Sequence, residues 1–132
     1  MKWVDDGMCF VCGKKNPDGF KLDFKINDNK TITTQWTPEK KYQGYADIVH
    51  GGIIGVFLDE TMVTLPWKLL NVPVASAQMT VRFKKPAKIG ETLFFTGEIV
   101  GDINQKIINT KADAKTSDGT LIAFATGKCV RV

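Results

Sequence analysis

The chain has 132 residues, a formal net charge of +4 and 43% hydrophobic residues. This length suits one compact domain, residues 1–132, and the composition is that of an ordinary globular protein. The basic residues form scattered pairs rather than one long run, which does not favour a nucleic-acid interface. The sequence has no stretch of about 18 apolar residues, so no segment is predicted to span a membrane.

The first part of the chain, residues 1–19, is predicted to be irregular because it is rich in turn-forming dipeptides. It lacks the long apolar segment of a secretory signal, so we expect a cytoplasmic protein with reduced thiols. Two of the three cysteines, Cys9 and Cys12, have metal-ligand spacing. Even with Cys129 they supply fewer than the four ligands of a closed zinc site, so neither a metal nor another cofactor is predicted.

Alternating apolar residues and turn dipeptides predict six strands. Two form a hairpin before the middle of the chain, and four follow it. In chain order they are Phe20–Asn27, Thr31–Thr37, Val74–Lys85, Thr92–Val100, Lys106–Thr116 and Leu121–Val132.

Between these two groups of strands, residues 52–70 contain no turn dipeptide and are apolar on almost every side. This pattern predicts a buried helix, with Pro66 expected to kink or end it. A single helix cannot build repeated βαβ units. The order of elements therefore predicts an α+β hotdog fold, an antiparallel sheet of about six strands wrapped around one long central helix. Large aromatic residues, including Phe57 and Phe83, are expected mainly in its core, with the alternative that some line an acyl pocket.

The start of this helix carries the sequence His50-Gly51-Gly52, and Asp59 follows two turns later. Glycines allow another group to approach the backbone closely, and the free N–H groups of a helix start favour an oxyanion. A carboxylate in an otherwise apolar helix is costly unless it is paired or used. This combination suggests an oxyanion donor and a general base.

Gly51 and Asp59 are eight residues apart, which is about 12 Å along one helix. A reacting carbonyl must lie about 3 Å from both its oxyanion donor and its attacking group. One helix cannot supply both, whereas two antiparallel helices from different chains can. The sequence therefore predicts a two-fold dimer with shared sites, either alone or as a dimer of dimers.

Over essentially its whole length the chain resembles the PaaI-like branch of the hotdog-fold acyl-CoA thioesterases. The resemblance rests on the glycine pair with Asp59 seven places later and on two further segments. These are Ser76-Ala77-Gln78-Met79-Thr80-Val81-Arg82-Phe83-Lys84-Lys85-Pro86-Ala87-Lys88-Ile89-Gly90-Glu91 and the N-terminal Cys9-Phe10-Val11-Cys12-Gly13 with Asn16-Pro17-Asp18-Gly19.

The resemblance implies a role for each matching residue. The amide of Gly51 would hold the thioester carbonyl, with His50 shaping the turn. Asp59 of the partner chain would activate water or attack directly, and Ser76 would help to place the water or the carboxylate. Several relatives carry an oxyanion-assisting Asn six residues before the His. Here that residue is Gly44, and the neighbouring Gln43 is the candidate substitute.

Simpler interpretations stand beside these roles. His50 is either a turn residue that orients the site or an acid–base group, and Asp59 is either catalytic or a buried, paired carboxylate. Gly52 and Glu60 are candidate substrate-facing neighbours. Lys84, Lys85 and Lys88 form either a solvated strand end or a contact to the phosphates of coenzyme A.

The predicted function is hydrolysis of an acyl-CoA, including aryl-acyl-CoA, to a carboxylic acid and coenzyme A. One alternative is a hotdog enoyl-CoA hydratase or dehydratase, although the position of the only histidine fits this poorly. Another is a non-catalytic acyl-CoA-binding protein, which would bind the thioester without turning it over.

Overall fold

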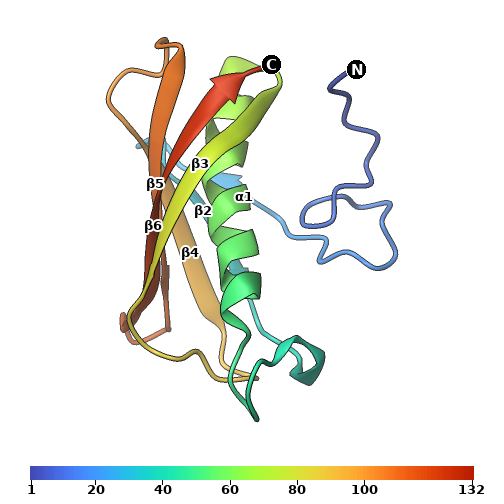
Figure 1. Cartoon of the computed structure of the whole chain (residues 1–132), viewed down its shortest axis with the longest axis vertical. Coiled ribbons are helices and arrows are strands. Elements are labelled where there is room, and N and C mark those ends of the chain that lie inside the picture. Colours follow the sequence, from blue (N-terminus) through green and yellow to red (C-terminus); the bar gives the residue numbers. More distant parts are fainter.

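The computed structural model describes residues 1–132 and shows one long helix packed against a six-stranded antiparallel sheet (Figure 1). This arrangement confirms the predicted α+β hotdog architecture. The strands lie in the order β1-β2-β4-β5-β6-β3 across the sheet. The elements are β1 (Lys25–Ile26), β2 (Ile32–Trp36), the short 3-10 helix η1 (Lys40–Tyr42), α1 (Gly51–Leu70), β3 (Val74–Phe83), β4 (Leu93–Val100), β5 (Ile107–Lys115) and β6 (Leu121–Arg131).

The helix α1 begins at Gly51, one residue before the predicted start. Asn71 caps its other end in the left-handed conformation, where its N–H donates to the carbonyl of Trp67. Pro66 lies inside α1 and does not end it. The structure contains no helix that combines the length and apolar character needed to cross a bilayer.

The helix is covered on two sides. The sheet packs against one side, and the N-terminal segment lies across the other (Figure 1). Phe57 of α1 is fully buried between them, with ring centroids 4.7 Å from Phe20, 4.4 Å from Trp36 and 5.4 Å from Phe95. This aromatic cluster joins the N-terminal segment, the helix and the sheet into one core.

The predicted strand Phe20–Asn27 is wrong over most of its length, because only Lys25–Ile26 pairs with β2. Lys21 has a φ of 52°, which interrupts an extended chain. The amides of Phe20 and Leu22 donate instead to carbonyls of the N-terminal loop. The alternation of apolar residues was real, but it reflects side chains that point into the core from an irregular segment.

Strand β3 is an edge strand that pairs only with β6. It is ten residues long, and most of its side chains are exposed. Its outer edge therefore presents unpaired backbone N–H and C=O groups, which in most proteins are covered or paired with another chain.

One testable consequence of the close helix–sheet packing involves Gly97 of β4. A Cβ at this position would lie 2.9 Å from Cγ2 of Thr61 and 3.1 Å from Cγ2 of Ile32. We expect Gly97→Ala to lower the free energy of unfolding by about 1–3 kcal/mol, the usual cost of overpacking a core. Urea unfolding at one fixed protein concentration measures this.

The control is the double variant with Thr61→Ser. This change removes Cγ2 but keeps the hydroxyl, which donates to the carbonyl of Phe57 at 2.6 Å. The double variant should recover part of the loss caused by Gly97→Ala. A Gly97→Ala protein as stable as the parent would show that the helix does not approach β4 this closely.

Candidate active site

The start of α1 leaves one backbone donor free. The amide of Gly52 donates to Nδ1 of His50 at 2.9 Å, and the amide of His50 donates to the carbonyl of Tyr42 at 2.9 Å. The N–H of Gly51, the first residue of the helix, has no partner in the chain. The donor that remains available at the positive end of the helix is therefore that of Gly51.

His50 acts as the N-cap of α1. Because Nδ1 accepts a hydrogen bond from an amide, this nitrogen carries no proton. The geometry thus gives His50 an orienting part in the turn.

A pocket of about 320 Å³ opens beside Gly51. A Cβ on Gly51 would lie 3.3 Å from the ring of Phe83, so the glycine lets this ring approach the helix start. Phe83 is 56% exposed and lines this pocket, so the expectation that it lies in the core was wrong. The pocket is lined by Val49, Gly51, Ile54, Phe83, Lys84, Lys85, Pro86 and Ala87.

Asp59 and Ser76 form the second part of the site. The hydroxyl of Ser76 donates to Oδ1 of Asp59 at 2.6 Å, which fixes the carboxylate against the beginning of β3. Ser76 pairs with Cys129 in the sheet. Burial raises the pKa of the Cys129 thiol above its ordinary value, and the charge of Asp59 adds to the rise. Asp59 is half-buried, and its carboxylate is held by the Ser76 hydroxyl.

The two parts do not meet within one chain. Gly51 lies beside Phe83, at the C-terminal end of β3. Asp59 is hydrogen-bonded to Ser76, near the N-terminal end of the same strand. The helix separates Gly51 from Asp59 by two turns, about 12 Å. A single chain thus carries the donor and the carboxylate as two separate halves.

The other predicted substrate-binding residues lie in different places. Lys84 and Lys85 line the pocket beside Gly51, whereas Lys88 is only next to it, in an isolated bridge with Ile48. Gln43 is already engaged, since its Oε1 accepts from the amide of Asp47 at 3.1 Å and thereby shapes the loop before the helix.

Glu60 points away from Asp59 and Ser76. Its Oε1 accepts from the Cys9 thiol at 3.6 Å and from the Thr64 hydroxyl at 3.4 Å. Burial and then Glu60 raise the pKa of the nearby Cys12 thiol above its ordinary value. The sequence-based prediction of no metal site took account of Cys9 and Cys12 but not of Glu60. Nothing in the spacing indicates that residues 9–12 lie on this turn of α1.

The comparisons with known proteins concern the family and the fold of the chain. The model of the thioesterase superfamily matches residues 46–123. The chain belongs to the thioesterase superfamily. The predicted resemblance is thereby confirmed. A search of the curated proteins found no match.

Solved structures of the superfamily share the fold. One thioesterase superfamily protein is 25% identical, with a TM-score of 0.81, and the match covers 91% of this chain and 61% of that one. A phenylacetic acid degradation-related protein from Ralstonia eutropha JMP134 is 19% identical, with a TM-score of 0.74 and 83% of each chain covered. A thioesterase protein with coenzyme A from Streptococcus pneumoniae TIGR4 is 15% identical, with a TM-score of 0.75, covering 84% of this chain and 85% of that one.

The capping role of His50 makes a testable prediction for stability. His50→Ala removes the acceptor for the Gly52 amide and is expected to lower the free energy of unfolding by about 0.5–2 kcal/mol. His50→Asn keeps a side-chain acceptor of a kind favoured at N-caps and should lose less. A His50→Ala protein as stable as the parent in urea unfolding would show that the cap contributes nothing.

Proposed function

We propose that this member of the thioesterase superfamily hydrolyses acyl-CoA thioesters, including aryl-acyl-CoA, in the cytoplasm. Superfamily membership supports thioester chemistry, and a solved structure of the same fold contains coenzyme A. The observation that carries the proposal is the pair of half-sites. A free amide at Gly51 and an oriented carboxylate at Asp59 are the two groups that thioester hydrolysis needs.

In the proposed reaction, the N–H of Gly51 donates to the thioester carbonyl oxygen and stabilises the negative charge that develops there. Asp59 takes a proton from water, and the water oxygen attacks the carbonyl carbon. The intermediate collapses with cleavage of the C–S bond. The proton held by Asp59 then passes to the departing coenzyme A sulfur. Ser76 keeps the carboxylate in position throughout.

The unpaired edge of β3 provides a way to bring the halves together. In antiparallel pairing of two β3 strands about a two-fold axis between Met79 and Thr80, Ser76 of one chain lies opposite Phe83 of the other. Because Asp59 is hydrogen-bonded to Ser76 and Gly51 lies against Phe83, this pairing brings Asp59 of one chain close to Gly51 of the other. This dimer, alone or as half of a tetramer, would therefore contain two complete sites.

The first test is Asp59→Asn, measured by release of free coenzyme A thiol from a panel of acyl-CoA and aryl-acyl-CoA substrates. Loss of the base should lower kcat roughly 10²–10⁴-fold. Ser76→Ala should lower it less, because the carboxylate remains. Unchanged turnover by Asp59→Asn would exclude the proposed mechanism.

A second test asks whether the site is shared between chains. Gly51→Pro removes the N–H at the first helical position, where proline is well tolerated, and also places a Cβ beside the ring of Phe83; it should lower kcat roughly 10²–10³-fold. Gly51→Ala keeps the N–H and is the matched control. A mixed dimer of Gly51→Pro with Asp59→Asn chains contains one site with both native groups, so mixing the two inactive variants should restore activity. No recovery in proven mixed dimers would contradict a shared site.

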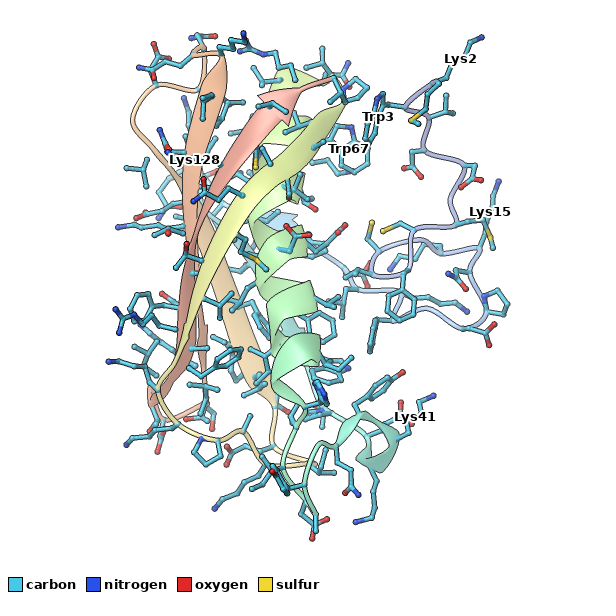
Figure 2. The ribbon with its side chains drawn as sticks, in the orientation of Figure 1. Lys2, Trp3, Lys15, Lys41, Trp67 and Lys128 are labelled. Atoms are coloured by element: carbon cyan, nitrogen blue, oxygen red, sulfur yellow. The ribbon has the colours of Figure 1, made fainter.

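A third prediction concerns the two lysines beside Gly51. Replacing Lys84 and Lys85 by alanine should raise KM roughly 1.4- to fivefold per lysine while leaving kcat nearly unchanged, since an exposed ion pair contributes about 0.2–1 kcal/mol. High salt should reduce the difference between parent and variant. Lys128→Ala, on the exposed face of β6 (Figure 2), is the control. A KM that is insensitive to Lys84 and Lys85 would remove the phosphate contact from the proposal.

A further inference from the structure

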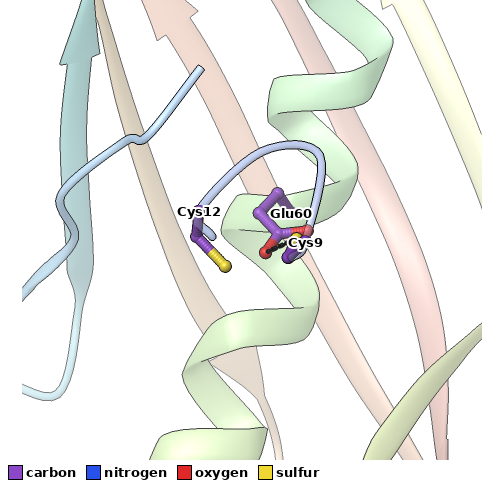
Figure 3. Close-up of side chains that lie close together, drawn as sticks. All are labelled: Cys9, Cys12 and Glu60. Atoms are coloured by element: carbon purple, nitrogen blue, oxygen red, sulfur yellow. Dashed lines mark hydrogen bonds between the residues drawn. The ribbon is translucent and has the colours of Figure 1, made fainter. Parts of the chain in front are cut away.

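A cysteine pair and a carboxylate meet where the N-terminal segment covers α1 (Figure 3). The ligand atoms of Cys9, Cys12 and Glu60 all lie within 4.8 Å of one another. Residues from distant parts of the sequence, 51 positions apart for Cys9 and Glu60, thus bring two thiols and one carboxylate to the same point, away from Asp59 and Gly51.

The loop that carries the thiols has a fixed shape. The amide of Gly13 donates to the carbonyl of Cys9 at 2.9 Å, which closes the turn around the pair. A Cβ on Gly13 would lie 2.4 Å from the Cys9 nitrogen and 2.5 Å from the Gly7 oxygen. Only glycine fits there, so the backbone holds Cys9 and Cys12 in one orientation toward the helix.

The cluster has no positive charge to balance its carboxylate. Glu60 is half-buried, and its hydrogen-bond partners are the neutral groups of Cys9 and Thr64. The three salt bridges of the chain lie elsewhere. Because an unpaired carboxylate loses solvation free energy on burial, a cation at this point would stabilise the folded chain.

We propose that Cys9, Cys12 and Glu60 bind a zinc-class divalent cation, with one coordination position left open. Zinc–sulfur and zinc–oxygen bonds of about 2.3 Å and 2.0 Å in tetrahedral geometry require a sulfur–oxygen separation of about 3.5 Å. The distance from Cys9 Sγ to Glu60 Oε1 is 3.6 Å. Two thiolates select zinc over magnesium or calcium. Binding would release the two thiol protons to solvent.

The open position has room for a fourth ligand. The three residues line a pocket of about 530 Å³, whose walls also include Trp3 and Trp67. Figure 2 shows these two indoles near the C-terminal end of α1. A water molecule or a ligand atom in this pocket completes the tetrahedron. The bound cation fastens the N-terminal loop to α1, and this role is independent of the proposed hydrolysis.

The test is a Co²⁺ titration of the reduced, chelator-treated protein, followed by absorbance and then by Zn²⁺ competition. We expect one equivalent of Co²⁺ per chain to give thiolate-to-cobalt charge-transfer and tetrahedral visible bands, which Zn²⁺ abolishes. Cys9→Ser and Cys12→Ser should remove the charge-transfer bands or reduce them strongly. Glu60→Gln should weaken affinity at least about tenfold, since even outer-shell partners of a metal contribute that much.

Two matched controls share the chemistry but not the location. Asp59→Asn changes the adjacent carboxylate of α1, and Cys129→Ser changes the third thiol, on β6. Both should bind Co²⁺ like the parent. The isosteric Glu60→Gln variant, checked for folding by circular dichroism, keeps the test decisive if a cysteine variant fails to fold. Absence of a stoichiometric cobalt spectrum, or unchanged affinity in Glu60→Gln, would overturn the proposed site.

Discussion

The hydrogen bond from the Gly52 amide to His50 Nδ1 is the contact on which the proposed chemistry depends. It fixes where α1 begins and occupies one of the two glycine amides. The N–H of Gly51 is left as the free donor, beside the ring of Phe83. A helix start without this cap would fray, and the direction of the free N–H would no longer be set relative to β3.

Strand β3 links this helix start to the remote carboxylate. It runs past Gly51 at one end and past Asp59 at the other, with its outer edge unpaired. A second chain that pairs with the free edge of β3 would therefore extend the sheet and bring the two half-sites together. In the proposed dimer, the pairing that removes an exposed edge also supplies the missing catalytic group.

Much of the fold could be predicted from the sequence because its signals are local. The apolar run of α1 and the alternation of β4 to β6 gave their bounds within about two residues, as element boundaries allow. Residues 20–24 were assigned wrongly because their alternation reflects core contacts rather than strand pairing. The family resemblance, and not a local pattern, pointed to Ser76 as a partner of the carboxylate. The orientation of Glu60 depends on how α1 is rotated between the sheet and the N-terminal segment, which no local sequence pattern indicates.

Asp59 and Glu60 illustrate that dependence. Consecutive helix residues point about 100° apart, since a turn takes 3.6 residues. Asp59 therefore faces the β3 edge and a serine, while Glu60 faces the N-terminal loop and two thiols. The same functional group has a hydroxyl donor and an open sheet edge in one case, and soft metal-ligand atoms in the other. The segment that packs against each face of α1 therefore determines the role proposed for the carboxylate on that face. Asp59 is available as the proposed base and Glu60 as a proposed cation ligand, because the two side chains point in different directions.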